Sequence, residues 1–491
     1  MSDSKILKRF SKFLIVKVLV LYLMIGHLAS SDAAEYSLVF DENRFSEKTI
    51  NVDDKTIAYR SYEGISYVSK PVDTRYQTMN FYVPSEYYQG KSIRNYTKET
   101  APIFLPNTVG GYMPGAAGRP GRDRGNLPNT IALALVKGYI VASPGARGRT
   151  LKDEKGLYTG KAPACIVDLK GAVRYLRHND KIMPGDAEKI ISNGTSAGGA
   201  LSSLLGATGN SPDYEPYLKA IGAATERDNI FAASCYCPIT NLENGDTAYE
   251  WLFYGVNSYN GWGKTGTINA DQIRISDQLK ALFPGYLNSL KLKKTDGSAL
   301  NLDEDGEGSF KDYVKSFVIA SAQNALDKGQ SLSDLGWITI KDGIVEDIDL
   351  GRFIAYATRM KTPPAFDTLD LSSPENSLFG TETIDNQHFT QFAMDKSTNH
   401  SLAERKIVKM MNPMNYIEAN RITTAKYWRI RHGAVDRDTS LAIPVILTTK
   451  LQNNGFNVDF ALPWGQGHGG DYDPDELFAW IDMICSESEN H

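Results

Sequence analysis

The residues best suited to chemistry in this sequence surround one serine, Ser196, in the segment GTSAG at positions 194–198. A short apolar run precedes the segment, and small and apolar residues at helical spacing follow it. A G-x-S-x-G segment between a strand and a helix is typical of the tight turn that lifts a nucleophilic hydroxyl off a sheet. Flanking glycines allow the strand and the helix to approach closely. We therefore predict that Ser196 is a nucleophile, the alternative being an idle serine in a glycine-rich turn.

A serine hydroxyl is a weak nucleophile, so it needs a nearby base, usually a histidine that a carboxylate orients. His468 is the best candidate among the seven histidines. It follows the last expected strand and lies in the glycine-rich loop 465–470, whose backbone leaves an imidazole free to reach inward. His432 ends the preceding expected strand, and we expect it to support the loop that carries the acid.

The acid is expected just after that preceding strand, because enzymes built on this turn carry the serine, the acid and the histidine in that chain order. Asp436 and Asp438 both lie there. Two carboxylates two residues apart should not both face the imidazole, and Asp436, three residues after the turn glycine Gly433, is favoured. Asp438 then remains a candidate N-cap of the next helix.

The negative charge that develops on a substrate carbonyl needs two backbone N–H donors, each worth about 3 kcal/mol of barrier. Ala197, directly after the serine, is expected to supply one donor. The second is expected from the glycine-rich loop 106–115, where Gly110 and Gly111 are both candidates.

Strands and helices must alternate along the chain to hold these residues. Buried strands are expected at 101–105, 138–142, 189–195 and 230–237, with helices at 129–137, 164–178 and 197–208 between them. Such alternation predicts the α/β class, a mostly parallel sheet with helices on both faces. Tyrosine-rich segments within 36–100 predict antiparallel strands at one edge.

The alternation stops near Pro238 and resumes late in the chain, with strands at 427–431 and 458–462 and helices at 439–453 and 474–485. Between them the sequence is aromatic and charged, with acidic and glycine turns. We therefore expect a core formed by residues 35–240 and 412–491, interrupted by an inserted domain at 241–411.

The composition is that of a soluble globular protein, with 491 residues, 42% apolar and 23% charged residues. A formal net charge of −5 argues against nucleic acid or an anionic surface as the main partner. The four cysteines, Cys165, Cys235, Cys237 and Cys485, are too few for a disulfide framework and are expected to be structural. We expect a small-molecule substrate, no metal and no cofactor.

The first 34 residues have the layout of a signal peptide. Basic residues precede an apolar run at 13–28, and small residues follow it at 29–34. The run is interrupted by Lys17 and is short for a membrane span of about 20 residues, which favours cleavage over a permanent anchor. We therefore expect a secreted or periplasmic protein that does not stay in the membrane.

Five segments together resemble bacterial tannases over nearly the whole chain after residue 34: NGTSAGGA, PNTVGGYMPG, RMKTPPAFDTLDLSSPENSLFG, WRIRHGAVDRDTS and FALPWGQGHGGDYD. The long third segment, inside the expected insertion, is far more specific than G-x-S-x-G. The resemblance implies an α/β-hydrolase core with a large lid-like insertion that hydrolyses galloyl esters. It also implies a catalytic triad of Ser196, Asp436 and His468.

The same resemblance implies that Lys361, Glu375 and Asp438 bind the galloyl group. Phenolic hydroxyls donate hydrogen bonds to carboxylates and accept them from an ammonium, so these side chains suit the task. Without the resemblance, Lys361 and Glu375 are expected to be solvated surface charges. A feruloyl or general aryl esterase, a serine peptidase and an inactive binding protein of the same fold are the alternatives.

Overall fold

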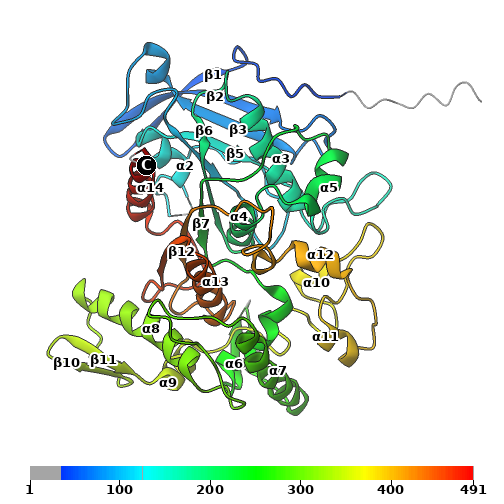
Figure 1. Cartoon of the computed structure of the whole chain (residues 1–491), viewed down its shortest axis with the longest axis vertical. Coiled ribbons are helices and arrows are strands. Elements are labelled where there is room, and N and C mark those ends of the chain that lie inside the picture. The colour runs from blue at the N-terminus through cyan, green and yellow to red at the C-terminus, as the bar shows by residue number, and fades with distance from the viewer. Residues whose placement is uncertain (1–34, 124, 262, 490–491) are drawn as a thin grey trace, which may run out of the picture. The chain divides into compact units, whose positions relative to one another are not determined.

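The computed structural model describes residues 35–123, 125–261 and 263–489, so the expected signal peptide lies outside the described residues. Nine strands form one mixed sheet in the order β1-β2-β3-β5-β4-β6-β7-β12-β13 (Figure 1). The strands are β1 (Ser46–Val52), β2 (Lys55–Ser66), β3 (Thr78–Pro84), β4 (Pro102–Pro106), β5 (Ile140–Pro144), β6 (Asp186–Thr195), β7 (Ala232–Tyr236), β12 (Tyr427–Arg431) and β13 (Asn457–Ala461).

The sheet has an antiparallel edge and a parallel body. Strands β1, β2, β3 and β5 pair antiparallel, whereas every pair from β5 to β13 is parallel. This arrangement confirms the predicted α/β class and the antiparallel strands expected from the tyrosine-rich N-terminal segments. Because the carboxyl ends of parallel strands lie at one edge, loops after β6, β12 and β13 can meet there.

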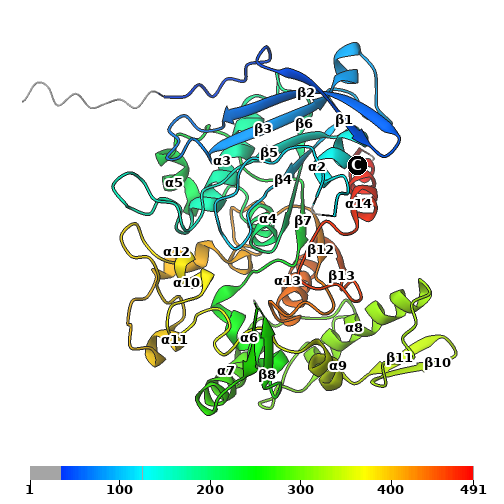
Figure 2. The same cartoon turned by 180° about the vertical axis from the view of Figure 1, so that it is seen from behind.

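Helices cover both faces of the sheet. Helices α2 (Thr130–Val136) and α14 (Pro474–Glu489) lie together on one face, and α3 (Ala164–His178) and α4 (Ala197–Ala207) lie on the other (Figures 1 and 2). The strands β4, β7 and β12 are buried along their whole length. Apolar residues on both faces of these strands therefore form the core, as expected for a covered parallel sheet.

One helix begins later than the sequence predicted. Helix α13 (Ala442–Asn453) was expected from residue 439, but its N-cap position is Leu441. Pro444 lacks a backbone N–H and is tolerated best in the first turn of a helix, where that N–H has no intrahelical partner, and this agrees with a start at Ala442. Asp438 is therefore not the N-cap of this helix, and that alternative is wrong.

The chain between β7 and β12 forms helices of very different length and two separate hairpins. Its elements are α6 (Gly245–Phe253), β8 (Ser258–Gly261), β9 (Lys264–Thr267), α7 (Ala270–Ser289), α8 (Ser309–Asp327), β10 (Ile338–Lys341), β11 (Ile344–Ile348), α9 (Leu350–Ala357), α10 (Pro374–Leu378), α11 (Gln391–Lys396) and α12 (Arg405–Met410). Strands β8 and β9 form one two-stranded sheet, and β10 and β11 form another. Whether 241–411 is a domain in its own right stays a prediction. A short helix of the core, α5 (Glu215–Ala220), precedes β7.

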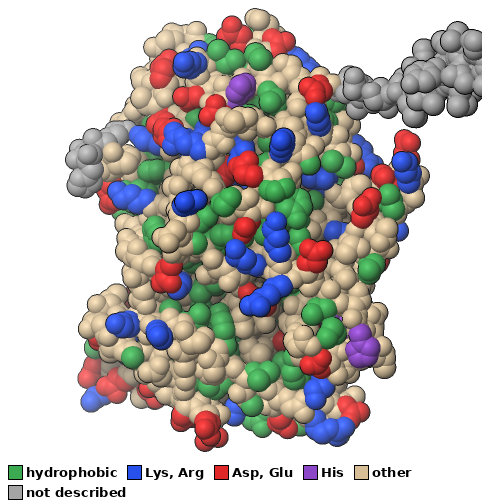
Figure 3. Space-filling view, turned by 45° about the vertical axis from the view of Figure 1, so that its right-hand side comes forward, with side chains coloured by type: hydrophobic (Ala, Val, Ile, Leu, Met, Phe, Trp, Pro, Cys, Tyr) green, Lys and Arg blue, Asp and Glu red, His purple; other side chains and the backbone are tan. Residues whose placement is uncertain are grey.

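The surface carries mixed charge. On the face seen in Figure 3, Lys and Arg side chains gather around a hollow in its middle, although the net charge of the whole chain is −5. None of the helices in the described part of the chain is long and apolar enough to cross a membrane.

Candidate active site

The turn around Ser196 has the strained geometry that its sequence predicts. Ser196 has φ 61° and ψ −123°, a left-handed backbone that non-glycine residues rarely adopt. A Cβ on Gly194 would lie 2.3 Å from the carbonyl oxygen of Gly198, and a Cβ on Gly198 would lie 2.7 Å from that of Val109. Both glycines are therefore required for β6 and α4 to approach each other and the neighbouring loop.

Three side chains from separate loops form one hydrogen-bonded chain. The Nε2 of His468 lies 2.8 Å from the Oγ of Ser196, and its Nδ1 lies 2.8 Å from the Oδ2 of Asp436. A carboxylate accepts hydrogen bonds only, so Nδ1 carries the proton and Nε2 is free to accept the serine proton. The structure thus brings together the three residues that the sequence singled out as nucleophile, base and acid.

Asp438 also faces the imidazole, contrary to the expectation that only one of the two carboxylates could. Its Oδ2 lies 3.8 Å from the Nε2 of His468, whereas Asp436 bonds to Nδ1. The backbone N–H of Asp438 donates to the Oδ1 of Asp436 at 2.8 Å, which turns the two side chains to different nitrogens. The expectation was wrong because an imidazole has two nitrogens, and each carboxylate lies near a different one.

The local charges suit a proton transfer. Burial raises the pKa of Asp436, but the neighbouring His432 and the hydrogen bond from His468 outweigh it, so the pKa lies well below its usual range. Burial lowers the pKa of His468, and the hydrogen bond and charge of Asp436 more than compensate, so that its pKa is raised. Asp436 is therefore ionised and stabilises the imidazolium form of His468.

His432 lies beneath the acid without bonding to it. Its Nε2 is 3.7 Å from the Oδ2 of Asp436, and neither ring nitrogen hydrogen-bonds to another described residue. Ligand atoms of Cys237, His432 and Asp436 all lie within 4.8 Å of one another. An ion at this point would compete with His468 for the Oδ2 of Asp436. Cys237 and His432 are therefore better understood as residues that pack around the carboxylate of Asp436.

Two charged residues of the third resembling segment lie beside the serine. Lys361 and Glu375 line one cavity of about 480 Å³ together with Ser196, Asp438 and His468. The Nζ of Lys361 lies 2.9 Å from the Oδ1 of Asp438, and their side chains are only 14% and 10% exposed. Without the family resemblance, reasoning from the residues treated Lys361 and Glu375 as surface charges, and that reading is wrong.

These three charges modify one another. Burial raises the pKa of Glu375, although the ammonium of Lys361 opposes this. Burial lowers the pKa of Lys361, but the charges of Asp438 and Glu375 outweigh it and the pKa is raised. One ammonium between two carboxyl groups leaves acceptor oxygens for hydroxyl donors within the cavity.

The rest of the cavity wall combines polar and apolar side chains, with Lys264 and Gln272 among the polar ones. Apolar side chains of Ile239, Met360 and Pro374 line it. Of the residues expected to stabilise an oxyanion, Ala197 and Gly111 line this cavity, whereas Gly110 does not belong to its lining. The donors remain a prediction.

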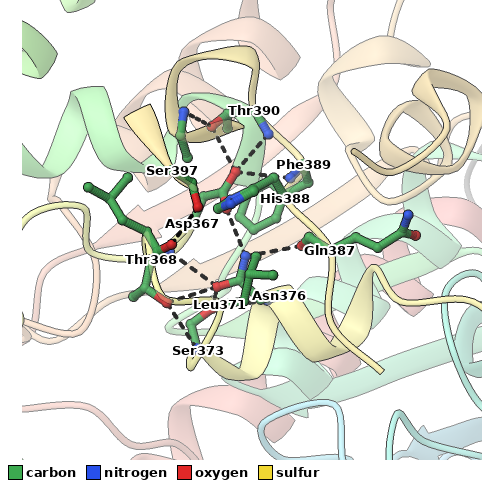
Figure 4. Close-up of polar contacts among 12 residues, drawn as sticks. Asp367, Thr368, Leu371, Ser373, Asn376, Gln387, His388, Phe389, Thr390 and Ser397 are labelled. Atoms are coloured by element: carbon green, nitrogen blue, oxygen red, sulfur yellow. Dashed lines mark hydrogen bonds and ion pairs between the residues drawn. The ribbon is translucent and has the colours of Figure 1, made fainter. Parts of the chain in front are cut away.

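A buried carboxylate fixes the helix that carries Glu375 (Figure 4). Asp367 accepts hydrogen bonds from Asn376 Nδ2 and His388 Nδ1, both at 2.7 Å, and from Thr390 N and Oγ1, both at 2.8 Å. Asn376 directly follows Glu375 on α10, so the network sets the position of that helix. His388 therefore has a structural partner in the insertion.

The loop that carries His468 is held by two aspartates that the sequence reasoning missed. Asp471 accepts from Asn193 Nδ2 at 2.9 Å, and Asp473 accepts from the hydroxyl of Tyr236 at 2.5 Å. Asp473 also pairs with the buried Arg429 of β12. Arginines in a strand expected to be buried were the available signal, because a buried guanidinium requires a carboxylate partner.

The acid loop and the histidine loop pack backbone to backbone. Val435 N donates to Gln466 O at 3.1 Å, and a Cβ on Gly433 would lie 2.3 Å from that same oxygen. The glycine-rich stretch before His468 is thus placed by direct contacts with the loop that carries Asp436.

Comparisons with known proteins agree with this geometry. The BD-FAE family model matches residues 106–249. The esterase LipQ of Mycobacterium tuberculosis is 31% identical over 90 residues, which is 18% of this chain and 20% of that esterase.

Solved structures match far more of the chain. A tannase from Fusobacterium nucleatum is 54% identical, with a TM-score of 0.90, over 92% of this chain and 100% of that one. A tannin acyl hydrolase from Lactobacillus plantarum is 47% identical, with a TM-score of 0.89, over 91% and 99%. A tannin acyl hydrolase in complex with ethyl gallate is also 47% identical, with a TM-score of 0.88, over the same shares.

The close packing of the histidine loop yields a first prediction. A Cβ on Gly470 would lie 1.9 Å from Thr195 Oγ1, so Gly470→Ala should displace the loop and move His468 away from Ser196. We expect kcat/KM for a simple aryl ester to fall about 100-fold, because a small misplacement of a catalytic group is costly. Gly469→Ala is the matched control, since no atom lies within 4 Å of the position of its Cβ. Equal activities of the two variants would contradict the account.

Proposed function

Because this chain belongs to the bacterial tannase family and is a carboxylic ester hydrolase, we propose that it hydrolyses galloyl ester and depside bonds of hydrolysable tannins and simple gallate esters. Gallic acid is the released acid in this proposal. The observation that carries it is that Lys361, Glu375 and Asp438, whose exposed fractions are 14% or less, line the cavity that contains Ser196. Buried charges are costly unless they have a partner or a function, and a trihydroxylated ring fits this set of donors and acceptors.

The proposed reaction begins with attack of the Ser196 Oγ on the ester carbonyl carbon. His468 Nε2 takes the serine proton, and the ionised Asp436 stabilises the imidazolium. The oxyanion is stabilised by backbone N–H groups, with Ala197 and Gly111 as the expected donors. The proton then passes from His468 to the leaving alcohol, and a galloyl ester of Ser196 remains.

A water molecule completes the proposed cycle. His468 removes a proton from this water, which attacks the acyl carbon. The Oγ of Ser196 leaves with the proton from His468 Nε2, and gallic acid is released. No step requires a cofactor or a metal ion.

Recognition of the ring is proposed to fall to the buried charges. Glu375 and Asp438 accept hydrogen bonds from ring hydroxyls, and Lys361 donates to one of them. The solved relative that holds ethyl gallate supports a gallate ester as the substrate. A feruloyl or general aryl esterase is the main alternative, because it requires the same serine chemistry without this selectivity.

The export of the protein is also a proposal. The basic start and short apolar run of residues 1–34 favour a cleaved signal peptide. We expect N-terminal sequencing of protein collected outside the cytoplasm to begin near residue 35. Recovery of membrane-bound enzyme that still carries Met1 would favour an anchor.

Removal of the nucleophile tests the chemistry. Ser196→Ala should reduce the turnover of methyl gallate by several orders of magnitude, as loss of a triad member does, because the attacking hydroxyl is removed. Binding of gallic acid, measured by calorimetry, should persist, since the side chains proposed to bind the ring remain. Turnover above about a tenth of the wild-type value would exclude Ser196 as the nucleophile.

Selectivity tests the recognition. Wild type should strongly prefer methyl gallate to methyl benzoate, by roughly four orders of magnitude, because the analogue leaves buried polar groups unpaired. Asp438→Asn, Lys361→Ala and Glu375→Ala should each reduce this ratio, measured as kcat/KM for both esters. Asp436→Asn is the control and should slow both esters alike.

Two results would overturn that assignment. A gallate preference unchanged in both Lys361→Ala and Glu375→Ala would support a general esterase instead. If Asp436→Asn changes the gallate-to-benzoate ratio of kcat/KM while Asp438→Asn slows both esters equally, the two aspartates have the reverse roles.

A further inference from the structure

One buried hydroxyl joins the segment that carries Lys361 to the loop that carries the two aspartates. Tyr249, on α6, is fully buried. Its hydroxyl accepts from the backbone N–H groups of Met360 at 3.0 Å and Lys361 at 3.1 Å. It donates to the carbonyl oxygen of Arg437 at 3.0 Å. One donor and two acceptor positions are all that a hydroxyl has, so every one is used.

The contact with Arg437 matters because this residue lies between the two aspartates of the site. Arg437 stands between Asp436, which bonds to His468 Nδ1, and Asp438, which pairs with Lys361. The Tyr249 hydroxyl therefore fixes the backbone on both sides of the Lys361–Asp438 ion pair. It does so without lining the cavity itself.

The tyrosine ring is in turn held from several sides. It packs on Phe253, with ring centroids 4.6 Å apart, and edge-on against Phe366 at 6.3 Å. The ammonium of Lys361 lies 3.9 Å from the centre of that same Phe366 ring. Backbone and side chain of Lys361 are thus both placed by the cluster around Tyr249.

A buried ion pair reinforces the same segment. The guanidinium of Arg359 lies 5.6 Å from the centre of the Tyr249 ring and pairs with Glu250, the residue that follows Tyr249. Its Nε donates to the carbonyl oxygen of Lys361 at 2.8 Å. The carbonyl of Lys361 is therefore held by Arg359, while its N–H is held by Tyr249.

We propose that Tyr249 is a positioning residue that sets the Lys361–Asp438 pair in register with Ser196 and His468, and so couples recognition of ring hydroxyls to catalysis. This rests on the proposed function, because the coupling concerns the galloyl-binding charges. Tyr249 does not belong to the lining of the cavity that contains Ser196 and His468. Its effect must therefore appear in the selectivity between substrates as well as in stability.

The test compares two buried hydroxyls. Tyr249→Phe leaves two N–H groups and one carbonyl unpaired in the site and should lower kcat/KM for methyl gallate at least tenfold. The loss for methyl benzoate should be smaller, so the ratio of the two falls. Tyr214→Phe is the matched control, because the equally buried hydroxyl of Tyr214 donates to Met410 O at 2.5 Å, and Tyr214 does not line the cavity. It should lower the melting temperature and leave the ratio unchanged.

A double-mutant cycle separates coupling from a general loss of stability. In a Lys361→Ala background, Tyr249→Phe should cause little further change in the gallate-to-benzoate ratio, because the residue that it positions is gone. Full additivity of the two changes, or an unchanged ratio in Tyr249→Phe, overturns the proposal.

A second variant serves if Tyr249→Phe does not fold. Phe253→Leu keeps the Tyr249 hydroxyl but loosens the packing of its ring, and it should lower the gallate-to-benzoate ratio. An unchanged ratio in Phe253→Leu then overturns the proposal.

The result that would overturn the proposed function differs from the results that would overturn the role of Tyr249. A wild-type enzyme with no preference for methyl gallate over methyl benzoate would overturn the galloyl assignment itself. With that preference present, only the variants decide the role of Tyr249.

Discussion

The cavity depends on one costly constraint, the burial of a lysine and two carboxyl groups beside a serine and a histidine. Removing such ions from water costs several kcal/mol each, and only close partners offset that cost. Lys361 and Asp438 meet this condition with their 2.9 Å ion pair, while Glu375 lies near the same ammonium. An arrangement of this kind tolerates little movement, because a lost partner would leave a buried charge alone.

Several contacts around the cavity fix the positions of these charged side chains. The hydroxyl of Tyr249 and the guanidinium of Arg359 fix the backbone of Lys361. The carboxylate of Asp367 fixes α10, which carries Glu375. Side chains that are already held in place lose little conformational freedom when a ligand binds to them, and this favours binding. Lys361 and Glu375 thus come from the segment between β7 and β12, whereas Ser196 follows β6 of the main sheet.

Local sequence patterns sufficed for the core but not for the cavity. Ser196 was predictable because its turn requires glycines at fixed neighbouring positions, and alternating strands and helices indicated the loops that carry Asp436 and His468. The contacts of Lys361, Tyr249 and Asp473 join segments far apart in the chain, and no periodicity encodes such contacts. The orientation of Asp438 was predicted wrongly, because it follows from a hydrogen bond between its own N–H and Asp436.

The central claim is that the buried charges hold the galloyl ring so that the ester carbonyl reaches Ser196. A crystal structure of Ser196→Ala soaked with intact methyl gallate tests it most directly. The account predicts ring hydroxyls within hydrogen-bond distance of Lys361, Glu375 and Asp438, with the ester carbonyl carbon next to residue 196. An ester bound with its ring away from these three side chains, or with its carbonyl turned from residue 196, would contradict the claim.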